Sequence, residues 1–254
     1  MPFPLAHPAA VLPLRRWSIR YLSFVALLLG TITPDLSYCL EQYKVDVLAH
    51  SLRGCVIFSL PVGWILVLIS FRVGEPLVGL LPAPHRQVLL PACCHRRQPW
   101  FAVPLSVLIG AMTHVFWDSF THDTGWFVER SDFLQSTLFA WNGHSFQMYR
   151  LVWHVSTWVG LLLLYRAYAD HLKKCAPTAD LLSTDEKQRY VLWASLLLLP
   201  LVGAMPIAIL SQTKRLWSVA ALPQFLRFSA AVYLVMLSAL LIALGVSVKV
   251  RRHR

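Results

Sequence analysis

Residues 101–122 read FAVPLSVLIGAMTHVFWDSFTH, and their composition changes along the stretch. The first part is apolar enough to enter a bilayer, where a spanning helix needs about 20 mainly apolar residues. The second part carries His114, Asp118 and His122, which are four residues apart and so lie near one face of a helix. Because ionisable groups are costly in a membrane and usually serve a function there, the stretch predicts a membrane helix with a functional polar end.

The composition of the whole chain is that of an integral membrane protein. Of its 254 residues, 57% are apolar and 14% are charged, whereas soluble domains are about 45–50% apolar and about 25% charged. The formal net charge of +11 comes from basic residues that flank the apolar segments. Such residues set membrane topology and contact anionic lipid, so we expect membrane lipid and no nucleic acid as a partner.

Apolar segments of spanning length predict an all-α, polytopic membrane protein with about five to six transmembrane helices. The clear candidates are Ser51–Phe71, Phe101–Phe120, Arg150–Tyr168, Tyr190–Ser211 and Phe225–Val248. An earlier segment, Trp17–Thr33, has a short apolar core. It is compatible with a short span, an interfacial helix, a half-inserted helix or a signal peptide.

The distribution of His and Asp predicts three regions. Residues 1–165 form a membrane domain with the candidate metal ligands, 166–189 a cytoplasmic linker, and 190–254 a C-terminal pair of transmembrane helices with almost no such residues. Any chemistry is therefore expected in the first region.

Lys and Arg predict the orientation of the chain in a bacterial inner membrane. With six spans, sixteen basic residues fall on the side of the C-terminus and seven on the other. If Trp17–Thr33 does not span, the ratio becomes thirteen to ten and the N-terminus moves to the outer side. Both alternatives place the C-terminus in the cytoplasm.

With the chain in this orientation, polar residues from four segments fall at one membrane depth, near the outer face. They are Asp35, His50, His114, Asp118, His122 and His154. A single His-x-x-x-Asp pair is also common as an ordinary helix contact, but the convergence of six potential ligands from four segments predicts a metal site. Imidazole and carboxylate suit zinc and similar ions. His7 joins this site if Trp17–Thr33 inserts partway, and lies on the opposite side if that segment spans.

The order of these residues resembles that of a known family. The chain begins MPFPLAHPAAVLPL, and a Pro-Asp pair, a His-Ser pair and HVFWDSFTHDTGWF follow. This resembles a family of bacterial membrane proteins of unassigned function whose members begin M-P-F-x-x-x-H-P-A-A. That family in turn resembles the LexA-regulated inner-membrane metal-dependent hydrolases. The match covers about residues 1–165.

More distantly, the His/Asp order is similar to the zinc-dependent phospholipase C and P1-type nuclease superfamily, all-helical enzymes that hydrolyse phosphodiesters with three zinc ions. The resemblance implies a first ion on Asp35, His50, His114 and Asp118, with Asp118 bridging. It implies a second ion on His122 and His154, and a third near His7. Trp158 stands where the superfamily has an acidic residue, and the chain lacks the N-terminal tryptophan ligand. We therefore expect one or two ions, with zinc preferred.

The expected chemistry is metal-dependent hydrolysis of a lipid or lipid-linked phosphoester, with Asp35 and Asp118 as the catalytic carboxylates. Asp35 is either a metal ligand or the general base. Two other functions remain open, a transporter that uses the His/Asp residues as a proton or ion relay and a non-catalytic protein with a structural metal. HExxH, G-x-S-x-G and P-loop motifs are absent from the sequence. The oligomeric state is left open.

Overall fold

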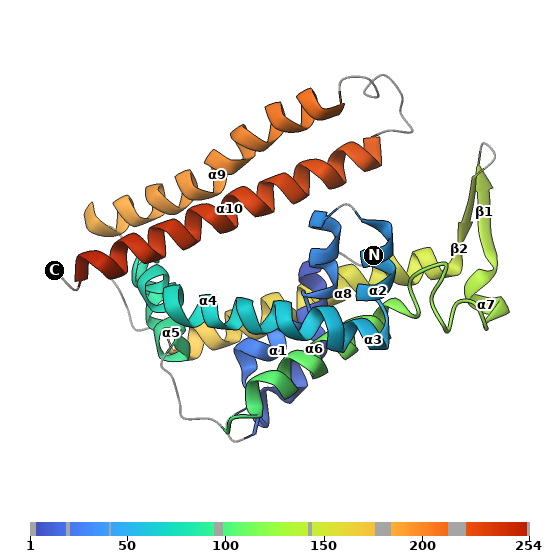
Figure 1. Ribbon diagram of the computed structural model, residues 1–254, viewed down its shortest axis with the longest axis horizontal. Coiled ribbons are helices and arrows are strands. Elements are labelled where there is room, and N and C mark those ends of the chain that lie inside the picture. Colours follow the sequence, from blue (N-terminus) through green and yellow to red (C-terminus); the bar gives the residue numbers. More distant parts are fainter. Residues whose placement is uncertain are drawn as a thin grey trace. The chain divides into compact units, whose positions relative to one another are not determined.

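The computed structural model describes residues 4–18, 21–40, 42–93, 99–141, 144–175, 184–212 and 222–252, and these are mostly helical (Figure 1). The chain divides into two compact units. The first comprises Met1–Leu68 and Arg96–Asp170, and the second comprises Ile69–His95 and His171–Arg254. All the candidate ligands predicted from the sequence belong to the first unit.

The first unit consists of short helical segments around two longer helices. Its elements are η1 (Pro4–Arg16), α1 (Phe24–Gly30), η2 (Pro34–Leu40), α2 (Tyr43–Ala49), α3 (Leu52–Gly54), the π-helical η3 (Cys55–Ser59), the start of α4 (Leu60–Gly79), α6 (Ala102–Asp118), α7 (Asp132–Gln135), β1 (Thr137–Trp141), β2 (His144–Gln147) and most of α8 (Met148–Cys175).

Helices α1 and α6 run parallel at very short range. The Ser23 N–H donates to Ser106 Oγ at 2.8 Å, and eight residues further along both segments His114 Nδ1 lies 2.7 Å from the Thr31 carbonyl oxygen. Between these contacts, a Cβ on Gly110 would lie 2.4 Å from the Leu27 carbonyl oxygen. Glycine therefore permits the approach that brings α1 to the polar end of α6.

The N-terminal η1 is a 3₁₀ helix that contains Pro8 and Pro13. Proline lacks the N–H that a regular α-helix requires, which accounts for the departure from α geometry. Ala6 and His7 are buried, and a Cβ on Gly160 of α8 would lie 3.0 Å from the Ala6 carbonyl oxygen. This packing seats His7 in the interior.

Segments α3, η3 and α4 form one continuous helix, Leu52–Gly79. Gly63 lies against Val107, while His50, just before the helix, lies near Asp118 at the end of α6. The two helices therefore run antiparallel, and the start of one meets the end of the other.

A small antiparallel hairpin departs from the expected all-α fold. Strand β1 pairs with β2 through Phe139↔Phe146 and Ala140↔Ser145, with an irregularity after Thr137. Aromatic residues favour strands, and the rings of Phe139 and Phe146 stack with centroids 4.9 Å apart.

The second unit contains the end of α4, α5 (Ala83–Cys93), α9 (Thr184–Gln212) and α10 (Leu222–Arg252). In this unit the Glu186 carboxylate accepts hydrogen bonds from the Ala83 N–H at 2.7 Å and from Arg86 Nη2 at 3.1 Å. Arg189 donates to the Gly79 carbonyl oxygen at 2.7 Å. These bonds hold the turn between α4 and α5 against the start of α9.

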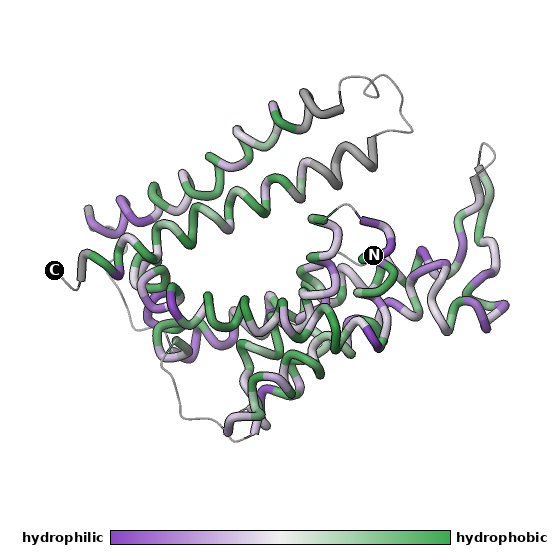
Figure 2. Tube along the Cα trace, viewed as in Figure 1, coloured by the Kyte–Doolittle hydropathy of each residue, from purple (hydrophilic) through white to green (hydrophobic). Residues whose placement is uncertain are grey.

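Among the described residues, two helices are long and apolar enough to cross a membrane, Leu52–Gly79 and Val232–Val250. Figure 2 shows the apolar stretches along α4 and α10. They coincide with the predicted Ser51–Phe71 and Phe225–Val248. The predicted Phe101–Phe120 is the shorter apolar helix α6. The expected five to six spans are therefore not confirmed.

The described helices also bear on the predicted segments Trp17–Thr33 and 166–189. Helix α1 has seven residues and is about 10 Å long, well short of a hydrocarbon core of about 30 Å. Helix α8 continues through Cys175, and residues 176–183 of the predicted linker lie outside the described residues.

Candidate metal centre

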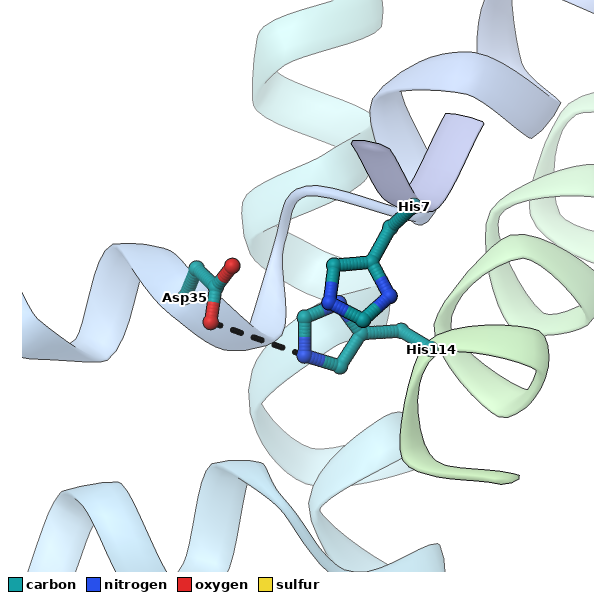
Figure 3. Close-up of side chains that lie close together, drawn as sticks. All are labelled: His7, Asp35 and His114. Atoms are coloured by element: carbon teal, nitrogen blue, oxygen red, sulfur yellow. Dashed lines mark ion pairs between the residues drawn. The ribbon is translucent and has the colours of Figure 1, made fainter. Parts of the chain in front are cut away.

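Six polar residues from four parts of the first unit lie close together where α6 ends. They are His7 on η1, Asp35 on η2, His50 at the end of α2, His114 and Asp118 on α6, and His122 just beyond α6. We call these six residues the His/Asp cluster. Figure 3 shows the stacked rings of His7 and His114, with the Asp35 carboxylate directed towards them.

Asp118 contacts imidazoles through both carboxylate oxygens. Its Oδ2 lies 3.1 Å from His114 Nε2 and 3.8 Å from His50 Nε2. Its Oδ1 lies 3.6 Å from His7 Nε2 and 3.6 Å from His122 Nδ1. One carboxylate therefore joins two pairs of histidines.

Asp35, on η2, contacts the first of these pairs, His50 and His114. Its Oδ1 lies 3.4 Å from His50 Nε2 and 3.5 Å from His114 Nε2. Asp35 is the second residue of η2, directly after Pro34, and it is buried. His50 Nε2 and His114 Nε2 thus each lie near one oxygen of Asp35 and one oxygen of Asp118.

Backbone carbonyl groups orient three of the imidazoles. His114 Nδ1 lies 2.7 Å from the Thr31 oxygen, His50 Nδ1 2.9 Å from the Asp46 oxygen, and His122 Nδ1 3.1 Å from the Asp118 oxygen. Because a carbonyl only accepts, the proton of each neutral ring resides on Nδ1, and Nε2 carries a lone pair. Metal-binding histidines are commonly oriented in this way.

Many polar atoms of the His/Asp cluster are buried without a hydrogen-bond partner among the described residues. They are both ring nitrogens of His7, Nε2 of His114, Nε2 of His122, Oδ2 of Asp35 and both carboxylate oxygens of Asp118. Buried polar atoms are normally paired, since leaving one unpaired costs about 1–3 kcal/mol. So many unpaired acceptors in one place indicate a site for a cation.

The separations match those expected for ligands of one ion. Ligand atoms about 2.0–2.1 Å from a tetrahedral zinc lie about 3.3–3.4 Å from one another. The four imidazole–carboxylate separations among Asp35 Oδ1, His50 Nε2, His114 Nε2 and Asp118 Oδ2 are 3.4, 3.5, 3.1 and 3.8 Å. The groups His7–Asp35–His114 and His50–His114–Asp118 also each have ligand atoms within 4.8 Å of one another. The buried His/Asp residues could therefore hold a metal ion.

The cluster is closed on one side and open on the other. The side chains of His7 and His114 are fully buried, whereas those of His50 and His122 are 18% and 25% exposed. The cluster is therefore accessible to solvent from His50 and His122.

Burial keeps two of the histidines neutral. It lowers the pKa of His7 to about 3, with His114 adding to the effect and Asp118 opposing it. Burial also lowers the pKa of His122, against the opposing effect of Asp118. A neutral imidazole has the lone pair that a metal ion requires.

His154 lies apart from the contacts that define the cluster. Its side chain is exposed, and its ring stacks on Phe146 and meets the edge of Trp153, with centroids 6.1 and 4.2 Å away. The expected ligand role of His154 thus has no support in the described contacts.

Two other residues with ligand atoms come after Asp118 in the chain. The Asp123 side chain is exposed and accepts a hydrogen bond from the Thr124 N–H. The side chain of His144 lies outside the described residues.

Three features of the site are not apparent from the sequence. Thr31 acts through its carbonyl group, which any residue possesses. Ser37 Oγ lies 2.5 Å from Asp46 Oδ1 and joins η2 to α2. The Tyr38 hydroxyl lies 3.5 Å from His50 Nε2. Ser37 and Tyr38 belong to T-P-D-L-S-Y and Asp46 to D-V-L-A-H, but only the fold brings these segments together.

These features define a mostly helical protein that has, in the part of the chain that the structure describes, two apolar helices of membrane-spanning length and a buried His/Asp cluster suited to a metal ion. The comparison with protein families finds one family that matches almost the whole chain. The chain belongs to the family described as a domain of unknown function (DUF4184), which matches residues 1–248. No curated protein and no solved structure matches it.

Proposed function

We propose that this chain is a membrane-embedded, metal-dependent hydrolase that acts on a phosphoester of a lipid or lipid-linked substrate. The observation that carries the proposal is the set of four ligand separations of 3.1–3.8 Å between two imidazoles and two carboxylates. The resemblance of the His/Asp order to metal-dependent hydrolases supports the choice of reaction.

Zinc is the preferred ion because a set of two imidazoles and two carboxylates suits it. Asp35, His50, His114 and the Oδ2 atom of Asp118 would hold one ion. The Oδ1 atom of Asp118, with His7 and the Nε2 atom of His122, would hold a second. The second set has three protein residues and so leaves a position for water or substrate, as catalytic zinc sites do.

Bound zinc would supply an activated water and polarise a phosphoryl oxygen. The protein residues would position the metal ligands and the substrate. Asp118 holds the two halves of the site together, and the carbonyl groups of Thr31 and Asp46 fix the rings of His114 and His50. The exposed side of His50 and His122 admits the substrate. Asp35 Oδ2 is buried without a hydrogen-bond partner among the described residues, so Asp35 would accept a proton from the attacking water if it lies near that water instead of binding the ion.

A membrane substrate follows from where the cluster lies in the chain. His50 comes two residues before the apolar helix Leu52–Gly79, so the cluster is expected at a membrane boundary. Because α1 is too short to span, the basic residues divide thirteen to ten, which favours a cytoplasmic C-terminus and a site near the outer face of a bacterial inner membrane. We further propose that α6, α8 and α9 cross the membrane with Leu52–Gly79 and α10.

Phosphoester hydrolysis by the purified, zinc-loaded protein tests the proposal. Soluble phosphomonoesters, soluble phosphodiesters and phospholipid in mixed micelles should be compared for the wild type and Asp35→Asn. We expect hydrolysis of at least one class, with a loss of about 100-fold or more in the variant. Stable metal with no hydrolysis of any class would overturn the proposal.

A structural metal is the second candidate, and one observation favours it. The first ion would have four protein ligands, and such closed sites are typical of structural zinc. This alternative predicts that metal removal lowers the melting temperature and that the metal-loaded protein hydrolyses none of the three substrate classes.

A further inference from the structure

Helix α2 has an apolar outward face next to the exposed side of the His/Asp cluster. Tyr43 and Val47 are 80% and 55% exposed, whereas Ala49 is buried. Because Tyr43 and Val47 are four residues apart, they lie on one face of the helix, one turn from each other. His50 follows Val47 by three residues, ends the helix and is 18% exposed in its side chain.

The helix Leu52–Gly79 begins two residues after His50 with a similar outward face. The side chains of Leu52, Val56 and Ile57 are 67%, 55% and 64% exposed. This helix is long and apolar enough to cross a membrane. Contiguous exposed apolar side chains mark interaction surfaces, and at the start of such a helix they are suited to contact with lipid acyl chains.

Lys44 and Arg53 add positive charge to these two faces. Both side chains are exposed, and neither forms an ion pair within the part of the chain that the structure describes. Asp46, also on α2, does not neutralise them, because its Oδ1 lies 2.5 Å from Ser37 Oγ. Basic side chains beside an apolar surface lay their stems along it and reach the phosphate groups of lipids. The faces therefore complement both parts of an anionic phospholipid.

We propose that the outward faces of α2 and of the first turns of Leu52–Gly79 bind an anionic membrane phospholipid. Lys44 and Arg53 bind its phosphate group, and the exposed apolar side chains contact its acyl chains. As a docking surface for a substrate of the His/Asp cluster, these faces rest on the proposed function. Lipid binding itself requires no metal.

The test is phosphatidylglycerol binding by the detergent-purified chain, measured by native mass spectrometry for wild type and the double variant Lys44→Gln/Arg53→Gln. We expect binding to be at least about tenfold weaker in the variant, because both cations near the anionic headgroup are lost. Phosphatidylcholine, whose headgroup has no net charge, should bind wild type more weakly. The matched control is Lys173→Gln/Lys174→Gln, which removes two exposed cations from the end of α8.

A second variant tests the apolar part of the surface. Val47→Gln should bind phosphatidylglycerol about threefold or more weakly, because a polar side chain replaces an apolar contact with the acyl chains. Leu138→Gln is the control, since Leu138 lies on β1 and is 43% exposed. Glycerol phosphate, which has the phosphate without acyl chains, should not displace the lipid at equal concentration; equal competition would overturn the lipid assignment.

Equal phosphatidylglycerol affinity of wild type and Lys44→Gln/Arg53→Gln, or an equal loss in the α8 control, would overturn the surface and leave the metal centre intact. The same spectra report oligomers, so a lipid-free dimer that Val47→Gln abolishes would assign the face to a second copy of the chain instead. His114→Ala separates the two proposals, because it should lose metal and retain phosphatidylglycerol binding. Wild type that binds the lipid but holds no zinc would overturn the proposed function and leave the lipid surface.

Discussion

His114 Nε2 lies 3.1 Å from Asp118 Oδ2, while Nδ1 of the same ring lies 2.7 Å from the Thr31 carbonyl oxygen. In the neutral ring the proton is on Nδ1, so two acceptors face each other at hydrogen-bond distance. A cation bound between His114 Nε2 and Asp118 Oδ2 would remove the repulsion between these two acceptors. The alternative is a second proton on His114, which makes an ion pair and agrees with a proton relay. Metal binding therefore distinguishes a metal centre from a relay.

Asp118→Asn should impair metal binding more than Asp35→Asn does. Asp118 contacts four imidazoles and joins both halves of the site, whereas Asp35 contacts two. The carboxamide keeps the shape and removes the charge. We expect zinc affinity to fall by at least about 100-fold for Asp118→Asn and by less for Asp35→Asn. Competition with a chromogenic chelator measures both, and a greater loss for Asp35→Asn would contradict the bridging position of Asp118.

Ser37→Ala should weaken metal binding without removing a ligand. Ser37 Oγ bonds to the Asp46 side chain, and the Asp46 carbonyl group orients His50, so the serine couples the element of Asp35 to that of His50. Loss of an outer-shell partner commonly costs about 10–100-fold in affinity. The same chelator titration applies. Ser136→Ala is the control, because its exposed hydroxyl bonds only within its own turn among the described contacts; an equal loss in both variants would refute the coupling.

Gly110→Ala should destabilise the first unit. The added Cβ would meet the Leu27 carbonyl oxygen at 2.4 Å and force α1 away from α6. Such overpacking costs about 1–3 kcal/mol. Thermal unfolding in detergent should show a lower melting temperature, together with weaker zinc binding, because Thr31 moves with α1. Gly74→Ala is the control, since its nearest neighbour would be Cys93 Sγ at 3.7 Å. A melting temperature of Gly110→Ala equal to that of this control would contradict the close approach of the helices.

Glu186 should give the second unit a stability that depends on pH. Desolvation raises its pKa, but hydrogen bonds from the Ala83 N–H and Arg86 outweigh this and hold the pKa below its ordinary value of 4.5. A lowered folded-state pKa means that the contribution is complete above about pH 4.5 and is lost as the pH falls through the folded-state value.

Melting temperatures of wild type and Glu186→Gln from pH 6 to pH 3 measure this contribution. We expect the variant to be less stable at pH 6 and to lose less stability than wild type on acidification. Parallel curves for the two proteins would show that the carboxylate of Glu186 contributes no pH-dependent stability.

The sequence was most informative where spacing alone determines geometry. The four-residue intervals of His114, Asp118 and His122 place them along one helix end, and the contacts of Asp118 with both histidines follow. Asp35 and His50 were predicted from the ends of apolar segments, and both reach the cluster. The position of His7 was left open, because it depended on whether Trp17–Thr33 spans; the short α1 allows η1 to bring His7 to Asp118.

Other features depended on tertiary packing. His154 was predicted from its depth along a helix, but depth does not fix the direction of a side chain, and its ring packs on the hairpin residue Phe146. The hairpin is different, because the sequence between its strands is Asn142-Gly143, a two-residue pair typical of tight hairpin turns, so this local signal could have predicted it. The parallel contact of α1 and α6 depends on glycines that hydropathy does not distinguish.

The measurement that tests the account most directly is the zinc content of the chain, purified in detergent without chelator, for wild type, His114→Ala and His154→Ala. The His/Asp cluster predicts about one or two zinc ions per chain in wild type, a loss in His114→Ala, and retention in His154→Ala, whose imidazole is exposed and stacked on Phe146. Wild type that contains no metal and binds none on titration would contradict the metal centre and favour a proton or ion relay.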